Sequence, residues 1–430
     1  MRATVALILS IICCSALAPS ALAARRSLLG SDSNSKTATT ATYLYVWAGP
    51  KDASLGGKDS VFVISLADGE YGKIVSVVPT PYSTLEPHHC RISSTRTHLA
   101  CAGLFSALTG TPSVLFFELS DPRTPKLVDP AKVDQPKHSA FADEFVAIAD
   151  GGFLLSMMGS STGGSPGRVA HYSKDFKLIG EYPDPAKFPD IPGFNPHGLG
   201  VSWVHKTMVT VDYVVPASTL VGNPLTMWST VRLWNISDWT ITETIDASAQ
   251  GVKGPMDAVA IAETGAFYFE GGNGYIYYLD GKGPKPHVPV VAWDTYAGSA
   301  NRASAGCIMH PFRNGTRLLA APFVRDQVQL LDTTNPKKPK LLDTFQLPKG
   351  AGAHVVRLSA DELIGAVATY FLDQGAIGQV HAAGDMTVRL FRLNDRATKF
   401  ILRQPAKSLI DFKTVAKKQG IFRPHGLAIY

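Results

Sequence analysis

Short runs in which apolar and polar positions alternate recur along almost the whole chain, and segments with helical periodicity are scarce. Alternation with a period of two is typical of half-buried β-strands. Turn residues separate the runs, and the chain contains 38 glycines and 29 prolines. The pattern therefore predicts an all-β protein.

Seven segments share one pattern, in which an alternating strand, a polar turn and a second strand follow one another. These pairs lie roughly 45 to 65 residues apart, about the length of a four-stranded propeller blade. They cover 61–65 with 73–75, 114–119 with 125–128, 168–172 with 176–182, 231–235 with 240–245, 275–279 with 287–291, 328–332 with 340–345, and 388–393 with 399–402. Runs such as 152–156 and 317–321 supply the remaining strands. We expect one seven-bladed β-propeller over residues 42–430, in which the C-terminal strand at 427–430 completes a blade.

The beginning of the chain has the features of a targeting sequence. Arg2, an apolar stretch at 5–17 and the triplet Ala21-Leu22-Ala23 predict a signal peptide over residues 1–23, followed by a disordered leader over 24–41. No later run is long and apolar enough to span a bilayer, so we expect no integral membrane segment. The protein is predicted to enter the secretory pathway and to reach the extracellular space, a vacuole or another lumen. Glycosylation sequons at Asn235 and Asn314 agree with this route.

Net charge and cysteine content bear on the possible partners of the protein and on its disulfides. The formal net charge of +6 is modest and dispersed, which predicts no nucleic-acid partner. Outside the signal peptide the cysteines are Cys90, Cys101 and Cys307, an odd number that leaves one thiol unpaired or bridged to another chain. Cys90 and Cys101 could form a hairpin disulfide or remain core thiols, and Cys90 could also join a metal site. The sequence leaves these alternatives open.

Histidine recurs at the start of several predicted blades. Pro-His-Gly-Leu occurs at 196–199 and 424–427, and looser relatives lie at 87–92, 136–139 and 352–356. At these points a propeller chain returns from the rim to the central channel, so the imidazoles are expected to converge. Converging neutral imidazoles bind copper, iron or zinc. The predicted metal ligands are His88, His89, His138, His197, His354 and His425.

The identity of the metal and the role of the histidines each have an alternative. Copper is preferred and iron is the alternative, because an exported, imidazole-rich site with methionines at 157, 158, 256 and 309 suits copper. His310 is a reserve ligand, and the carboxylates expected to orient the imidazoles are Glu86, Asp143, Glu144 and Asp212. The histidines at 98, 171, 205, 287 and 381 are expected at the surface or in supporting positions. Alternatively, the converging histidines serve only as hydrogen-bonding core residues.

In the order and spacing of its motifs, the chain resembles the selenium-binding protein family, which includes copper-dependent methanethiol oxidases. The motifs are His88-His89 before a strand, the hairpin at 116–127, His138 followed by 154–159 and the turn at 176–180, the segment 231–244, the hairpin at 330–341, and 354–359 leading to 369–371. The resemblance implies a seven-bladed propeller with copper held by channel histidines. The cysteine pair that the family links with selenium has no counterpart near residues 43–51, and the family's histidine in the strand aligned with 322–326 is absent.

The resemblance also implies an activity, the oxidation of methanethiol with O2 and water to formaldehyde, hydrogen sulfide and hydrogen peroxide. We therefore expect an oxidoreductase, a copper-dependent oxidase that acts on a small thiol and O2. One alternative is a non-enzymatic binding propeller with structural histidines. Another is an iron-dependent dioxygenase of the carotenoid-cleavage type, with Phe371 and Trp203 lining its pocket.

Overall fold

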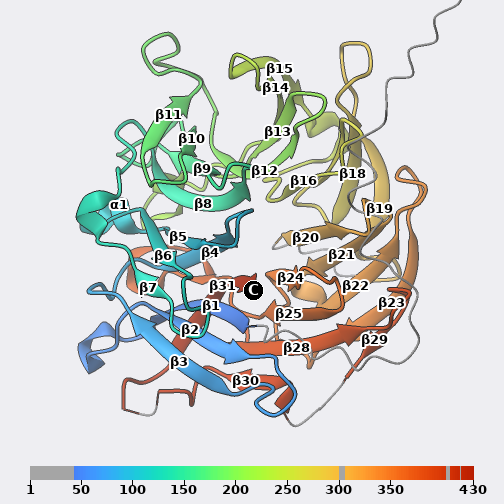
Figure 1. Ribbon diagram of the computed structural model, residues 1–430. Coiled ribbons are helices and arrows are strands. Elements are labelled where there is room, and N and C mark those ends of the chain that lie inside the picture. The colour runs from blue at the N-terminus through green and yellow to red at the C-terminus, as the bar shows by residue number, and fades with distance from the viewer. Residues whose placement is uncertain (1–42, 300–305, 403–406, 417) are drawn as a thin grey trace, which may run out of the picture. The chain divides into compact units, whose positions relative to one another are not determined.

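The computed structural model describes residues 43–299, 306–402, 407–416 and 418–430. The predicted signal peptide (1–23) and leader (24–41) lie outside these residues. Apart from one two-stranded hairpin, the described strands form seven sheets around a central axis (Figure 1), and the predicted seven-bladed β-propeller is confirmed. Each blade runs from an inner strand at the axis to an outer strand at the rim.

Four blades contain the first half of the chain and its C-terminal strand. From the inner strand outward, the blade that closes the ring consists of β31 (Phe422–Ile429), β1 (Tyr43–Pro50), β2 (Ser60–Ser65) and β3 (Ile74–Pro79). The next three are β4 (Pro87–Ile92), β5 (His98–Gly103), β6 (Val114–Glu118) and β7 (Lys126–Leu127); β8 (Ala140–Ala147), β9 (Phe153–Gly159), β10 (Arg168–Tyr172) and β11 (Leu178–Tyr182); and β12 (Pro196–Ser202), β13 (Thr207–Asp212), β14 (Thr230–Asn235) and β15 (Thr240–Asp246).

The other three blades follow the same order. They are β16 (Ala258–Ala260), β17 (Ala266–Glu270), β18 (Tyr275–Asp280) and β19 (Val290–Asp294); β20 (Cys307–Phe312), β21 (Arg317–Pro322), β22 (Gln327–Asp332) and β23 (Lys340–Gln346); and β24 (Val356–Leu358), β25 (Ile364–Ala368), β28 (Thr387–Leu393) and β29 (Phe400–Ile401), with β30 (Leu409–Asp411) also paired to β28. A separate hairpin joins β26 (Leu372–Asp373) to β27 (His381–Ala382). The short helices are α1 (Ser106–Thr109), η2 (Ala53–Leu55), η3 (Pro130–Lys132), η4 (Pro216–Thr219), η5 (Ser248–Gln250), η6 (Phe323–Arg325) and η7 (Gly375–Ile377).

The seven predicted strand pairs correspond to the two outer strands of the blades. From 241 to 246 the outermost strand β15 alternates between exposed residues and residues that are buried or partly buried, whereas all residues of β1 and β2 are buried. Middle strands are buried because blades pack face to face, so both of their faces contact apolar neighbours. The solvent-exposed face of an outermost strand such as β15 therefore leaves a clearer alternation in the sequence than a buried strand such as β2 does.

Pairing of the two ends of the propeller closes the ring. The inner strand β31 pairs antiparallel with β1, from Leu44 opposite Ile429 to Pro50 opposite Phe422. The predicted blade-completing role of the C-terminal strand is confirmed, and this strand begins earlier than the predicted residue 427. This pairing covers the inner edge of β1 and places the end of the chain beside the axis (Figure 1).

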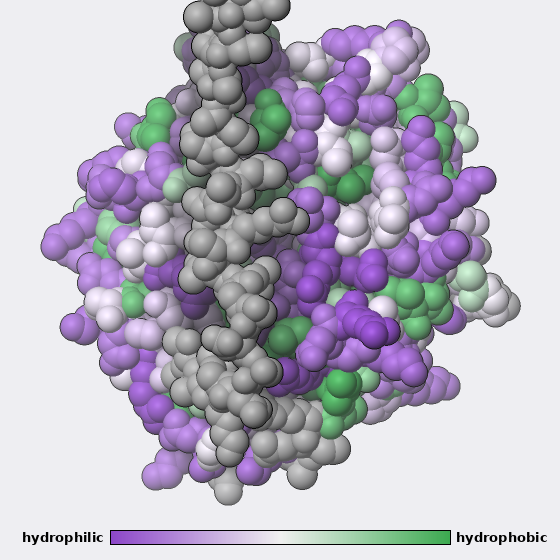
Figure 2. Space-filling model, turned by 45° about the vertical axis from the view of Figure 1, so that its right-hand side comes forward, coloured by the Kyte–Doolittle hydropathy of each residue, from purple (hydrophilic) through white to green (hydrophobic). Residues whose placement is uncertain are grey.

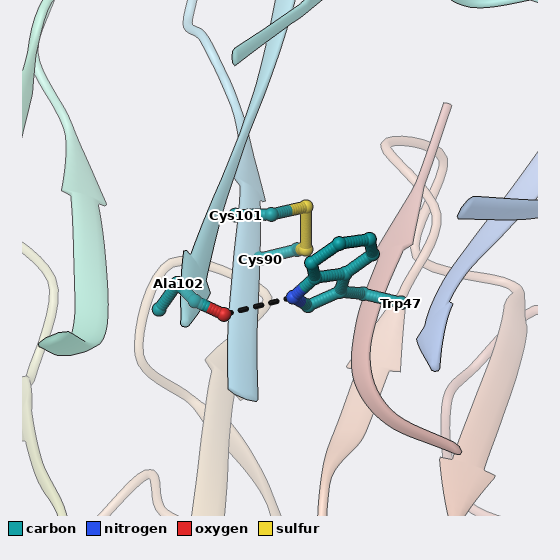
Figure 3. The surroundings of a disulfide bond; sticks show 4 residues. All are labelled: Trp47, Cys90, Cys101 and Ala102. Carbon is teal, nitrogen blue, oxygen red and sulfur yellow. Dashed lines mark hydrogen bonds between the residues drawn. A yellow bond between two sulfur atoms is a disulfide. The ribbon is translucent and has the colours of Figure 1, made fainter. Parts of the chain in front are cut away.

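Cys90 on β4 and Cys101 on β5 face each other and form a disulfide (Figure 3). Beside it, the Trp47 indole N–H donates a hydrogen bond of 2.8 Å to the Ala102 carbonyl, which ties β1 to the neighbouring blade. Cys307 is buried and unpaired. Of the alternatives that the sequence left open, the structure therefore contains the hairpin disulfide, and Cys90 has no free thiolate to offer a metal.

The face of the molecule drawn in Figure 2 is mainly polar. Figure 2 shows hydrophobic residues in small separate patches among hydrophilic ones on the face that it draws. Among the described residues, no helix has the length and apolar character needed to cross a bilayer.

The disulfide leads to a stability prediction. We expect the double variant Cys90→Ala/Cys101→Ala to lose about 2–4 kcal/mol of unfolding free energy, because the bridge restricts the unfolded chain. Urea denaturation followed by tryptophan fluorescence measures this loss. The matched control is Cys307→Ala, which removes a buried cysteine without a bridge and should remain sensitive to reductant. An unfolding midpoint of the wild type that reductant does not change would contradict the assignment.

Candidate metal centre

Five of the six predicted ligands meet at the axis: His88, His89, His197, His354 and His425. Each of the five residues is at most 3% exposed. The imidazoles of His88 and His425 have ring centroids 3.8 Å apart, and those of His354 and His425 lie 4.9 Å apart. Residues from four blades thus share one buried space.

The donor atoms form two overlapping groups in which all atoms lie within 4.8 Å of one another. One group contains His88, His89 and His425, and the other contains His88, Asp143 and His197. Asp143 joins the cluster directly, since its Oδ2 lies 3.1 Å from Nε2 of His88 and 3.2 Å from Nε2 of His197. The sequence predicted Asp143 only as a supporting group.

The side chains of the cluster lie where the pairing of the inner strands is interrupted by shifts of register. The pairing shifts in β4 across residues 88–89, in β8 across 143–144, in β12 across 197–198 and in β31 at 425. A bulge sets extra residues against the partner strand and changes the direction of their side chains. At four inner strands the irregularity therefore coincides with a residue of the cluster.

The glycine of the Pro-His-Gly motif has a packing role. A Cβ added to Gly426 would lie 2.3 Å from the His88 carbonyl oxygen, and a Cβ added to Gly198 would lie 2.5 Å from the Ala258 backbone nitrogen. Both distances are too short for a side chain. The motif therefore combines a channel histidine with the close approach of the next blade's inner strand.

Glu144 supports the cluster through one of its imidazoles. Its carboxylate contacts Nδ1 of His89 and accepts a hydrogen bond of 2.9 Å from Nη2 of Arg357. A second group that fixes the ring of a ligand histidine is common in metal sites. The other two predicted carboxylates have different partners: Asp212 pairs with Arg232 at 2.7 Å, and Glu86 pairs with Arg423 at 2.9 Å.

The structure does not bring His138 to the cluster. This residue is exposed two positions before β8 begins, and its backbone N–H donates to Glu181. The side chain lines a surface groove with Lys137 and Tyr182. Its blade contributes Asp143 to the axis instead. The reserve ligand His310 is also separate from the cluster and lines a different chamber of the channel.

Burial keeps most of the imidazoles neutral. It lowers the pKa of His197 to about 4 despite the opposing charge of Asp143, and it lowers the pKa values of His354 and His425 well below the ordinary range. Burial also lowers the pKa of His89, but Glu144 outweighs it and the net pKa is raised. Neutral imidazoles have a free lone pair, which is the form that binds a metal ion.

Many ring nitrogens of the cluster lack a partner. Among the described residues, no hydrogen bond of normal geometry is made by Nδ1 of His88, Nε2 of His89, Nδ1 of His197 or either ring nitrogen of His354 and His425. Buried polar atoms are normally paired, so their concentration at one point needs an explanation. Several unpaired imidazole nitrogens next to a carboxylate form a donor set that suits a transition metal.

An apolar cavity of about 60 Å³ adjoins the cluster. His88, Asp143 and His197 form its polar end, and its apolar lining includes Phe105, Phe141, Met158, Tyr213, Met227 and Phe371. Two of the predicted methionines, Met158 and Met256, belong to the buried apolar cluster at this end of the channel. The cavity gives one side of the histidines a water-poor environment.

Two loops from different blades join over this cavity. The loop between β13 and β14 meets the insertion between β25 and β28 through a β-bridge of Leu220 with Gly378. The backbone N–H of Gln379 donates to the Thr219 carbonyl at 2.9 Å, and its side chain donates to the Asn223 carbonyl at 2.6 Å. Both loops also supply residues of the cavity lining, including Leu220 and Gln374.

The sequence matches no protein-family model and no curated protein. Among solved structures, a hypothetical selenium-binding protein from Sulfolobus tokodaii is similar with a TM-score of 0.68 and 15% identity, covering 90% of this chain and 93% of that chain. The periplasmic gluconolactonase of Pseudomonas aeruginosa is similar with a TM-score of 0.56 and 13% identity, covering 91% and 99%. At these identities the likeness shows the propeller fold alone. The fold and the site together define a β-propeller with a histidine–aspartate cluster suited to a metal ion.

The glycine contact at the axis leads to a second prediction. Gly426→Ala is expected to destabilise the protein by about 1–3 kcal/mol, because the added methyl group pushes the inner strands apart. The control is Gly69→Ala, where a Cβ would meet nothing within 4 Å. Urea denaturation of the two variants tests the contact. Equal unfolding midpoints for Gly426→Ala and Gly69→Ala would show that the inner strands are not closely packed there.

Proposed function

We propose that the protein is a copper-dependent oxidase of small thiols. The observation that carries the proposal is the buried cluster of imidazoles with unpaired nitrogens at the polar end of an apolar cavity. The proposed ligands are His88, His89 and His425, with His354, His197 and Asp143 adjacent. Copper bound there would supply redox chemistry and Lewis acidity.

The residues around the cluster would orient the ligands and select the substrate. The contacts of Glu144 with His89 and Arg357 hold one ligand ring in place. Asp143 contacts His88 and His197 together and brings a negative charge that offsets part of the charge of a metal ion. The apolar cavity favours the alkyl group of a thiol and disfavours water.

The size of the cavity favours a small substrate. A volume of about 60 Å³ suits a molecule of few heavy atoms. A long polyene would require a much longer binding tunnel, so the cavity supports a small thiol over a carotenoid. The overall reaction converts methanethiol, O2 and water into formaldehyde, hydrogen sulfide and hydrogen peroxide, with the thiol carbon oxidised and O2 reduced by two electrons. The neighbour from Sulfolobus tokodaii is named a hypothetical selenium-binding protein, which is the family that the motifs of this chain resemble.

We also propose that the protein acts in an oxidising compartment of the secretory route. The buried bridge between Cys90 and Cys101 supports this proposal, since structural disulfides persist mainly in such compartments.

Metal content tests the proposed centre. The purified wild type is expected to bind about one copper ion per chain, because the cluster offers enough donors for one closed site. His89→Ala and His425→Ala should each abolish this binding, and Glu144→Gln should weaken it about 10- to 100-fold because a supporting group is lost. Elemental mass spectrometry and copper titration measure these effects. The matched control is His138→Ala, which should retain copper because its side chain lies outside the cluster.

The turnover assay separates the candidate functions. Copper-loaded protein is expected to consume methanethiol and O2 and to release formaldehyde and hydrogen sulfide, and His425→Ala should not. Iron in place of copper, with cleavage of a polyene, would move the protein to the dioxygenase class. A stably folded protein that takes up no metal on reconstitution would be a binding propeller with structural histidines.

A further inference from the structure

The central channel contains a second chamber on the other side of the histidine cluster. Its volume is about 190 Å³, and its walls come from the inner strands β4, β8, β12, β16, β20 and β24 and the residues next to them. The polar residues in these walls are Arg91, Glu144, Asp257, His310 and Arg357. Glu144 connects the chamber with the cluster, because its carboxylate contacts both His89 and Arg357.

The chamber leads toward the end of the propeller opposite the apolar cavity. An outer cavity of about 350 Å³ shares four lining residues with it: Arg91, His310, Pro311 and Arg357. Arg96 lines this outer cavity, and its guanidinium lies 4.1 Å from the centroid of the Tyr430 ring. Three arginines therefore line the path inward, and the one acidic residue in the described lining of the outer cavity, Glu362, is paired with Arg313 at 3.3 Å. Clustered guanidinium groups attract anions.

The acceptor groups of the chamber already have partners. Glu144 accepts hydrogen bonds from Arg357 and contacts Nδ1 of His89. Asp257 accepts the Met309 backbone N–H at 2.6 Å and the Ala258 backbone N–H at 2.8 Å. Both carboxylates are thus engaged by protein donors.

Donor groups remain without partners. Arg91 makes no ion pair within 4.0 Å in the part of the chain that the structure describes. Nε of Arg357 is buried and has no hydrogen-bond partner among the described residues. Arg91 and Arg357 both line the chamber, so the two guanidinium groups share one environment. An occupant with acceptor atoms and negative charge would satisfy both arginines.

We propose that this chamber binds a small oxoanion between Arg91 and Arg357. A guanidinium group presents planar, paired N–H donors that match the oxygens of phosphate, sulfate or a carboxylate. His310 adds a neutral imidazole to the wall, because burial lowers its pKa to about 3. The chamber volume accommodates an anion of this size. The two ends of the channel would then take different ligands, an apolar molecule at one end and an oxoanion at the other.

Isothermal titration calorimetry with inorganic phosphate and with sulfate tests the proposal. The full mature chain, as purified, is titrated at constant ionic strength in chloride buffer. We expect saturable binding at one site. Arg91→Gln should weaken this binding about 10- to 100-fold, because a charged hydrogen-bonding group is lost. The matched control is Arg123→Gln, which removes the same charge from an exposed pair with Glu70 and should bind the anion like the wild type.

Arg91→Lys provides a second variant that keeps the charge and removes the paired donors. It should bind more weakly than the wild type and more tightly than Arg91→Gln. Thermal unfolding of each variant checks that it is folded. Absence of saturable binding in the wild type, or equal affinities for the wild type and a folded Arg91→Gln, would overturn the proposal. The readout is independent of copper and thiol turnover, so its failure is distinguishable from failure of the proposed oxidase activity.

Discussion

The pairing of β31 with β1 is the interaction on which the rest of the structure depends. It joins the end of the chain to the start of the propeller in one sheet, so the ring closes and the blades can bury their faces against one another. A single blade exposes two apolar faces and would not be stable by itself. The same pairing places His425 against His88 at the axis. Closure of the fold and assembly of the histidine cluster are therefore one event.

Close approach of the inner strands gives the channel its chemistry. Register shifts in β4, β8, β12 and β31 direct consecutive or inserted side chains into a space with little room for water. Burial of polar groups is costly unless they are paired. In the cluster, Asp143 and Glu144 pair with some of the imidazole nitrogens. Other ring nitrogens have no partner and are available for a ligand. Incomplete pairing at the axis, within a well-packed fold, is the physical basis of the proposed metal centre.

The cluster also divides the channel into two different environments. One side is an apolar cavity covered by loops from two blades, and the other is a chamber lined by arginines and carboxylates. Both sides are built from the same inner strands: His89 and Arg91 both belong to β4, and each reaches a different environment. Two residues along β4, the neighbouring side chains change from imidazoles to guanidinium groups. The two sides of the cluster therefore suit different ligands, an apolar molecule on one side and an anion on the other.

The sequence by itself determined the fold class and the number of blades, and of the six histidines that it predicted as ligands five lie at the axis. The recurring strand pairs of the outer hairpins report the blade repeat, and a histidine at a blade entry lies beside the channel once the ring is closed. Only the tertiary structure decided between His138 and Asp143 as the contribution of their blade to the axis, and only it paired Cys90 with Cys101. It also brought Arg91 and Arg357 into one chamber. These outcomes depend on local bulges and on contacts between distant strands, which a residue pattern does not encode.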